Sequence, residues 1–426
     1  MLNKIIFISI LFFAQNTLFA EYVPGEVLVK VKKSSNISSY ARVSEISGSE
    51  LKIVKIDKSK NIMSAIEELA QNPDIEYAQP NYIYHISIVP NDTRYSDLWG
   101  LKNTGQTVTA ATYVPTHGNA GDDINAENAW GIITDCSSIT VAVIDTGVNY
   151  THDDLKNNMW DGGSSYPKHG WDFYNSDNDP VDDNGHGSHL AGIIGAQGNN
   201  SIGVTGVCWL TNIMALKSFD SSGTGSTATI ISAISFAINN GANIINASFN
   251  LYGSADTALS ATVTAAEQAD ILIVSAAGNG YENDGHAYNV DSGTKTYPCC
   301  FTQDNVLCIA ALDQKFQIAS FSNYGATSVD VAAPGTNVVS TWYTTNSTYY
   351  LENGTSMATP YAAGLAALVW ANNPSYTYLD VKNAVIYGGA AVSSMSGITV
   401  SGNVINAYNA LNYINVPRGL AAVVAK

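Results

Sequence analysis

The chain has 426 residues, of which 46% are apolar and only 13% charged. This composition excludes an intrinsically disordered chain, and the length predicts two or three folded units. The 19 basic and 36 acidic residues leave a net charge of −17, which argues against nucleic acid as a partner. Five cysteines are too few for a disulfide scaffold, and their odd number leaves at least one without an intramolecular partner.

Residues 1–20 have the layout of a secretory signal. Lys4 precedes an apolar run over 5–13, and a polar break then leads to Ala20. The apolar run is too short to span a bilayer, and no later segment reaches about 18 uninterrupted apolar residues. We therefore expect a secreted, extracellular monomer with no stable membrane insertion.

Residues 21–90 form a nearly neutral segment, with 8 basic and 9 acidic residues. The pattern predicts strands over 26–33 and 51–57 and helices over 38–46 and 62–71, followed by an extended end near residue 90. Elements of this length predict a small α/β unit.

Residues 91–426 carry the acidic bias, with 10 basic and 27 acidic residues. Continuous apolar runs predict strands over 139–145, 213–217, 243–248, 271–276 and 306–311, and helical patterns cover 226–240 and 255–269. Uniformly apolar strands separated by helices predict an α/β fold with a doubly wound, mostly parallel sheet and helices on both faces. In such sheets, ligand sites form beyond the carboxyl ends of the strands. We place this domain at 91–412 and treat 413–426 as a C-terminal tail.

Three polar residues stand in glycine-punctuated turns. Asp145 ends the strand in VAVIDTGV, His186 opens the helical run after DDNG, and Ser356 follows ENGT. Each has a simpler explanation: Asp145 as a loop cap, His186 with His189 as metal ligands, and Ser356 as a helix cap. No HExxH motif or Cys/His cluster supports zinc. The order Asp, His, Ser matches one of the known chain orders of the acyl-transfer triad.

With VIDTG, NGHGSH and GTSMATP in this order, residues 90–412 resemble the subtilisin family of serine proteases. The resemblance implies a serine endopeptidase with Ser356 as nucleophile, His186 as base and Asp145 orienting the base, acting through an acyl-enzyme. His189 is then structural. Asn279 in SAAGNG is the expected oxyanion donor, although Asn279-Gly280 is also a turn-forming pair. No organic cofactor is expected.

Two short segments resemble the family's substrate-binding edges, which would hold protein or peptide substrates. Their residues are Gly223, Thr224 and Gly225 on one side, and Ser248, Phe249 and Asn250 on the other. Asn250 stands where the family usually has glycine, which predicts a narrower or more polar pocket. Gly280 and Thr296, expected deeper in that pocket, are uncharged, so we expect no strong preference for a charged side chain. The resemblance also implies a cis bond before Pro298.

Two structural Ca²⁺ sites are suggested by the resemblance, because calcium takes six to eight oxygen ligands. The first site comprises Asp172, Asp177 and Asp179, with Asn175 in place of a frequent aspartate. The second comprises the side chains of Asp154 and Asn200 and the carbonyls of Gly198, Ile202 and Val204. The alternative for both is a solvated acidic loop.

The resemblance places the strands 139–145 and 213–217 side by side, which favours a Cys136–Cys208 disulfide in an exported protein. Cys308 then pairs with either Cys299 or Cys300, and the sequence leaves this choice open.

Residues 21–90 resemble the propeptides of secreted subtilisin-like proteases, which assist folding and inhibit the cleft within the same molecule. We expect self-cleavage between residues 85 and 91, favouring the bond after Ser87. Two other functions stay open. One is an inactive, calcium-dependent binding protein on the same scaffold, and the other is a processing protease restricted to one partner.

Overall fold

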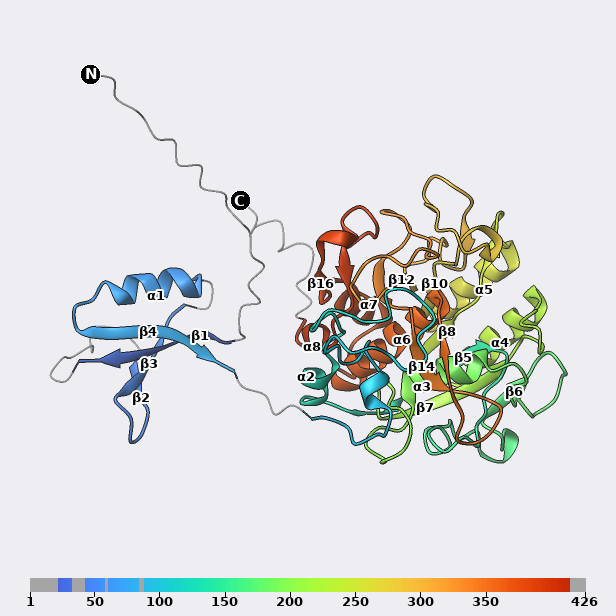
Figure 1. The fold of residues 1–426 in the computed structure, drawn as a ribbon, viewed down its shortest axis with the longest axis horizontal. Helices are drawn as coiled ribbons and strands as arrows, with labels where there is room; N and C mark the ends of the chain where they lie inside the picture. Colours follow the sequence, from blue (N-terminus) through green and yellow to red (C-terminus); the bar gives the residue numbers. More distant parts are fainter. Residues whose placement is uncertain (1–21, 33–42, 58–59, 84–87, 414–426) are drawn as a thin grey trace, which may run out of the picture. The chain divides into compact units, whose positions relative to one another are not determined.

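The computed structural model describes residues 22–32, 43–57, 60–83 and 88–413. The expected signal segment lies outside the described residues, as do nearly all of the tail and residues 85–87 of the expected cleavage region. The chain divides into two compact units, residues 1–86 and 87–426 (Figure 1). In the part of the chain that the structure describes, no helix combines the length and the apolar character needed to cross a membrane.

The smaller unit is a four-stranded antiparallel sheet with one helix. Its elements are β1 (Tyr22–Val31), β2 (Val43–Glu45), β3 (Leu51–Lys55), α1 (Ile62–Ala70) and β4 (Ile75–Tyr82), in the sheet order β2-β3-β1-β4. The side chain of Asn61 caps α1 by accepting from the N–H groups of Met63 and Ser64. Ile62 and Leu69 of α1 belong to the small core that this helix shares with the sheet.

The predicted helix over 38–46 is wrong where the structure describes it. Residues 43–45 form β2, which pairs antiparallel with β3 through Val43 opposite Val54. A short segment with a weak helical pattern gains more from the ladder of a neighbouring strand than from one isolated turn of helix. Residues 38–42 lie outside the described part of the chain.

The larger unit is built on a nine-stranded, mostly parallel sheet in the order β16-β17-β13-β12-β10-β8-β5-β7-β6. Its strands are β5 (Asp135–Asp145), β6 (Gly170–Asp172), β7 (Leu210–Lys217), β8 (Ile244–Ala247), β10 (Leu272–Ala276), β12 (Val306–Leu312), β13 (Val331–Pro334), β16 (Ala390–Ala391) and β17 (Asn403–Val404). Two antiparallel strand pairs lie outside this sheet. One is formed by β9 (Leu251–Tyr252) with β11 (Thr296–Tyr297), and the other by β14 (Val338–Thr341) with β15 (Tyr349–Glu352). The helices are α2 (Ala126–Trp130), α3 (His186–Gly195), α4 (Thr227–Asn239), α5 (Thr257–Gln268), α6 (Thr355–Asn372), α7 (Tyr378–Tyr387) and α8 (Ala407–Leu411).

Both faces of the sheet are covered, as the apolar strands predict. Along β5, Val141 and Val143 belong to the core that contains α3 and α6, whereas Ala142 and Ile144 belong to the core that contains α4 and α5. Because alternate side chains of a strand point to opposite faces, this division requires helices on both sides. The doubly wound α/β fold is therefore confirmed (Figure 1).

The strand order changes direction at β5. The next strands along the chain, β6 and β7, lie on one side of it, while β8, β10, β12 and β13 lie on the other. Ligand sites of open α/β sheets form at such a switch point, outside the carboxyl ends of the strands. Asp145 ends β5, Ser248 follows β8 and Asn279 follows β10.

Two disulfides are present. Cys136–Cys208 links the start of β5 to the segment before β7, and Cys299–Cys308 links the segment after β11 to β12. The structure thus selects Cys299 as the partner of Cys308 and leaves Cys300 as a free thiol. The bond before Pro298 is cis, as expected, and Val114-Pro115 is a second cis bond that the sequence did not suggest.

Candidate active site

Ser356 is the second residue of α6, the helix that crosses the core of the larger unit. The Ser356 Oγ donates to the carbonyl of Ser248 at 3.2 Å, and the Ser248 Oγ donates to the carbonyl of Ser356 at 3.0 Å. Because the first N–H groups of a helix have no partner within the helix, the start of α6 offers backbone donors beside this hydroxyl. The arrangement suits a group on which negative charge develops near Ser356.

His186 and Asp145 form a hydrogen-bonded pair. The His186 Nδ1 lies 2.8 Å from the Asp145 Oδ1, and the Asp145 side chain is 4% exposed against 30% for that of His186. A hydrogen bond to a carboxylate places the imidazole proton on Nδ1 and leaves Nε2 as the basic nitrogen. Gly187 permits the approach, because a Cβ there would lie 2.0 Å from the carbonyl of Gly147.

The charges around His186 favour its protonated form. Burial by itself lowers the pKa of this imidazole, but the surrounding carboxylates, with Asp145 first through its charge and hydrogen bond, together raise the pKa above its ordinary value. Asp182 and Glu352 add smaller effects in the same direction. A base with a raised pKa accepts a proton readily and holds it while charge develops on a reacting group.

Asp182, which the sequence analysis did not single out, holds the start of α3. Its carboxylate is buried and accepts from the N–H groups of Asn184, Gly185 and Ser188 and from the hydroxyls of Ser188 and Thr146. An aspartate four residues before a histidine at a helix start is the signal that would have found it. Its role is to position the turn that presents His186.

His189 is fully buried, and its environment keeps it neutral. Its Nε2 lies 3.1 Å from the carbonyl of Val338 and 3.2 Å from that of Tyr350, so this nitrogen is the donor. Burial, followed by the charge of His186, lowers the pKa of His189 to about 3. The ring therefore links α3 to β14 and β15 and does not titrate near neutral pH.

Asn279 has one end of its amide fixed. Its Oδ1 accepts from the N–H of Thr355 at 2.8 Å and from the Thr355 hydroxyl at 2.9 Å. The Nδ2 is left to face the start of α6, 3.4 Å from where a Cβ of Gly354 would lie. A fixed amide donor next to Ser356 is the geometry required to stabilise an oxyanion.

These residues converge on one pocket, in which the structure unites most of the predicted site. Its lining residues are Asp145, Thr146, Asn184, His186, Phe219, Gly223, Ser248, Phe249, Asn250, Asn279, Asn283 and Ser356. Thr224 and Gly225 are not among them, and neither are Gly280 and Thr296, which are buried behind the surface. The pocket is therefore lined by polar and aromatic groups, with Asp145 the only acid and His186 the only base.

Asn250 gives this pocket a polar atom without a partner. Its Oδ1 is buried, and no donor reaches it among the described residues. A buried acceptor that lacks a hydrogen bond is costly, so a bound group with an N–H or O–H would satisfy it. The side chain thus adds polarity where glycine would leave open space.

Comparison with protein families shows the family to which this fold belongs. The model of the subtilase family matches residues 137–395, which include Asp145, His186, Asn279 and Ser356. The chain belongs to the subtilase family. It is a serine protease of this family, as the sequence analysis expected.

Relatives of this subtilase cover both of its units. It is 33% identical over 404 residues to a thermophilic serine proteinase of Bacillus sp. (strain AK1), covering 92% of this chain and 88% of the relative. It is 35% identical over 291 residues to thermitase of Thermoactinomyces vulgaris, covering 68% of this chain and 94% of the relative. Among solved structures, a protease from Pseudoalteromonas arctica PAMC 21717 matches with a TM-score of 0.60 and 26% identity, covering 76% of this chain and 99% of that one.

The smaller unit has a match of its own. Residues 15–81 match the model of the fervidolysin N-terminal prodomain. The subtilase therefore carries an N-terminal prodomain, in agreement with the resemblance drawn from the sequence.

The loop around Asp154 fits a divalent cation. Asp154 is fully buried, and neither it nor Asp92 forms an ion pair with Lys or Arg in the described part of the chain. Among the described residues, no donor reaches the buried Asp92 Oδ1, while the Asp92 Oδ2 accepts from the N–H of Asn199. Burial and then the charge of Asp154 raise the pKa of Asp92 to about 6, which a bound cation would relieve.

Asp92 was not among the ligands predicted from the sequence, because it lies far along the chain from Asp154 and belongs to no motif. Two of the other predicted ligand residues contact Asp154. Asn200 donates to its Oδ1, and the N–H of Val204 and the hydroxyl of Tyr349 donate to its Oδ2. Gly203 permits the loop to close, because a Cβ there would lie 2.2 Å from the Asp154 Oδ2. Asp92 and Asp154 are two buried carboxylates, the type of oxygen ligand that calcium prefers.

The loop 172–179 has a different arrangement. Asp179 accepts from the hydroxyl of Tyr150 and forms an ion pair with Lys168, while Asp172 accepts from the backbone and side chain of Asn175. No group of three or more acidic, histidine or cysteine side chains converges as a metal site among the described residues. Because Lys168 already pairs with the carboxylate of Asp179, this carboxylate does not fit the role of a calcium ligand. The first site therefore stays a prediction that the geometry does not support.

Proposed function

We propose that this subtilase is a secreted serine endopeptidase that hydrolyses peptide bonds in proteins through an acyl-enzyme. The observation that carries the proposal is the shared pocket of Asp145, His186, Asn279 and Ser356, with His186 oriented by Asp145 at 2.8 Å. The family membership supports it, because the family match over 137–395 contains all four of these residues.

The chemistry follows from the groups in the pocket. Ser356 attacks the scissile carbonyl, and His186 takes the hydroxyl proton at Nε2 and later gives it to the leaving amine. Because the Ser356 hydroxyl donates to the carbonyl of Ser248 in the free enzyme, it must give up that bond to donate to His186. Asp145 keeps the Nδ1 proton in place and stabilises the imidazolium.

The oxyanion that forms on the substrate would receive two kinds of donor. One is the Nδ2 of Asn279, whose amide is held by Thr355, and the other is the backbone at the start of α6. Such donors accelerate the reaction because they meet charge that exists only in the transition state. Ser248, Phe249, Asn250 and Gly223 would line the part of the pocket that holds the substrate.

The division of the chain is that of a zymogen, an inactive precursor with a propeptide ahead of the peptidase domain. We assign residues 1–20 to export, 21–90 to an inhibitory, folding-assisting propeptide, 91–412 to the peptidase and 413–426 to a tail. The prodomain match over 15–81 supports the second assignment. Residues Asp92, Asp154, Asn200, Gly198, Ile202 and Val204 would hold a structural Ca²⁺, which would neutralise buried carboxylates and has no part in the chemical step.

Hydrolysis of an unstructured protein by the purified enzyme, with cut sites mapped by mass spectrometry, tests the proposal. Wild type should cleave it, and Ser356→Ala should not. Cleavage at many sites indicates a general endopeptidase, whereas cleavage of a single partner protein would identify the restricted processing enzyme.

A further inference from the structure

The segment 277–280, which carries Asn279, leaves the sheet as soon as β10 ends. The N–H of Ala277 still donates to the carbonyl of Ile309 at 3.0 Å, but the next residues make no ladder bonds. Gly278 and Gly280, on either side of Asn279, have φ values of 102° and 89°, a left-handed backbone that glycine adopts without strain. The direction of the Asn279 amide therefore depends on contacts from outside β10.

Asn323 supplies most of these contacts. It is fully buried, and its Nδ2 donates to the carbonyls of Ala277 at 3.2 Å and Gly280 at 3.4 Å. Its Oδ1 accepts from the N–H of Gly280 at 3.0 Å, and its own N–H donates to the carbonyl of Gly278 at 2.9 Å. One residue thus binds the backbone on both sides of Asn279.

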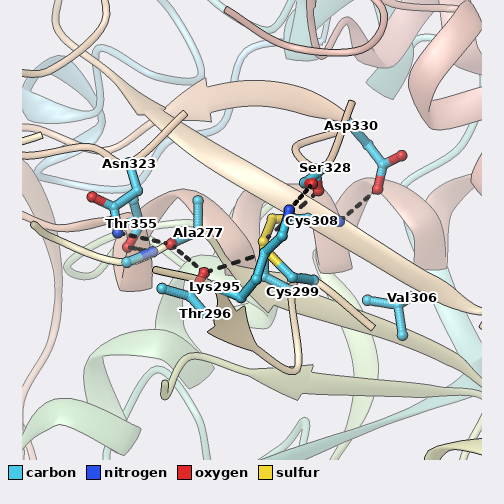
Figure 2. The surroundings of a disulfide bond; sticks show 12 residues. Ala277, Lys295, Thr296, Cys299, Val306, Cys308, Asn323, Ser328, Asp330 and Thr355 are labelled. Carbon is cyan, nitrogen blue, oxygen red and sulfur yellow. Dashed lines mark hydrogen bonds between the residues drawn. A yellow bond between two sulfur atoms is a disulfide. The ribbon is translucent and has the colours of Figure 1, made fainter. Parts of the chain in front are cut away.

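Two threonines complete the frame around Ala277 (Figure 2). The Thr296 hydroxyl donates to the carbonyl of Ala277 at 3.0 Å, the same carbonyl that Asn323 binds. The Thr355 hydroxyl accepts from the N–H of Gly278 at 3.2 Å. Thr355 also holds the side chain of Asn279, whereas Asn323 and Thr296 contact only the backbone of the segment.

We propose that Asn323 is a positioning residue for the oxyanion donor Asn279. The proposal rests on the proposed function, in which Asn279 stabilises the oxyanion. An oxyanion donor is effective because it is preorganised, and a displacement of about 1 Å at a reacting centre can cost about 100-fold in rate. Asn323 restrains the segment at Ala277, Gly278 and Gly280, on both sides of the donor.

The expected kinetic signature is a change in kcat with little change in KM. The oxyanion exists in the transition state and not in bound substrate, so a misplaced donor weakens only transition-state binding. Asn323 does not line the pocket, and its removal therefore leaves direct substrate contacts unaltered. A residue with only a structural role would lower stability and leave kcat of the folded enzyme unchanged.

The experiment compares Asn323→Ala with a matched control, Asn305→Ala. Asn305 is also a fully buried asparagine, and its Nδ2 donates to the carbonyl of Ile271 at 3.0 Å, at the opposite end of β10. With one peptide substrate, Asn323→Ala should lower kcat about 10- to 100-fold with KM within about twofold. Asn305→Ala should lower the melting temperature and keep kcat.

A double variant tests whether Asn323 acts through Asn279. In the Asn279→Ala background the donor is already absent, so adding Asn323→Ala should change kcat by less than about twofold. If Asn323→Ala does not accumulate as folded enzyme, Asn323→Asp carries the test. It has nearly the same shape and keeps the acceptor for Gly280, but as a carboxylate it cannot donate to Ala277 or Gly280.

The outcomes separate this inference from the proposed function. Normal kcat in folded Asn323 variants, equal kcat losses in Asn305→Ala, or fully additive effects in the double variant would overturn the inference. Wild-type enzyme without peptidase activity, or Ser356→Ala with full activity, would overturn the proposed function. A normal kcat in Asn279→Ala would remove the oxyanion role and the inference together.

Discussion

Thr355 donates two hydrogen bonds to the Oδ1 of Asn279, from its backbone N–H at 2.8 Å and its hydroxyl at 2.9 Å. Thr355 directly precedes Ser356, so the candidate nucleophile and the candidate oxyanion donor are held to each other through one residue. The two hydrogen bonds also fix which end of the Asn279 amide is free, because an occupied Oδ1 leaves Nδ2 as the donor. The start of α6 therefore orders both parts of the site.

Ser356→Ala should prevent maturation. If the chain cuts its own propeptide, removal of the nucleophile should leave an unprocessed protein from Glu21 to Lys426, while wild type gives two fragments. The change deletes one oxygen atom, so the fold should persist. Expression in a host without other proteases, followed by N-terminal sequencing, measures this. Normal processing of the variant would show that another protease makes the cut.

His186→Ala and His189→Ala should have opposite profiles. Loss of the proposed base should lower kcat by about 10⁴- to 10⁶-fold with little change in stability. His189→Ala removes the donor to the carbonyls of Val338 and Tyr350 and should cost about 1–3 kcal/mol of unfolding free energy. Its kcat should stay within a fewfold of wild type. Thermal unfolding and steady-state kinetics on both variants distinguish the two roles, and a fully active His186→Ala enzyme would contradict the triad.

Glu352→Gln should move the acidic limb of the pH–rate profile to lower pH. His186 must be neutral to accept a proton, and the carboxylates of Asp145, Asp182 and Glu352 all favour its charged form. Removing the charge of Glu352 lowers the pKa of His186, so the enzyme stays active at a more acidic pH. The measurement is kcat/KM against pH, with Glu267→Gln as a control. An unchanged midpoint would show that Glu352 does not influence the base.

Chelation should lower the melting temperature and accelerate self-digestion. A ligand that binds only the native state stabilises it by about 2.7 kcal/mol at a concentration one hundred times its Kd. Asp154→Ala should abolish the difference between chelated and calcium-loaded enzyme, whereas Asp177→Asn should preserve it. Differential scanning calorimetry with and without calcium gives these values. Loss of the difference in Asp177→Asn alone would move the site to the loop 172–179.

Asn250→Gly should change the preference for the residue before the scissile bond. The buried Oδ1 of Asn250 lacks a donor, so wild type should favour glutamine over the similarly shaped methionine by about tenfold, the contribution of one neutral hydrogen bond. The variant should lose this ratio and accept larger apolar side chains. The kcat/KM values for a pair of peptides differing only at this residue provide the test. Equal ratios in the two enzymes would exclude a contact from Asn250.

Sequence periodicity was sufficient for five adjacent strands of the central sheet, and it missed β6, β13, β16 and β17. The apolar runs 243–248, 271–276 and 306–311 correspond to β8, β10 and β12, because a strand buried on both faces is mostly apolar. The motifs around Asp145, His186 and Ser356 were sufficient for the family, since they mark the ends of elements where the backbone can present a side chain. The segment 43–45 was misread because a short strand depends on its neighbour, β3, for its hydrogen bonds.

The tertiary structure decided what depends on residues that are distant in the chain. It joined Cys308 to Cys299 and not to Cys300, and it placed Asp92 and Asp154 against the same loop, through Asn199 and Asn200. It also placed Asn323 against both sides of Asn279, although nothing near Asn323 in the sequence marks this role. Local patterns report which face of an element is buried, whereas these pairings follow from the direction in which separate loops leave the sheet. That direction is set by packing of the whole domain.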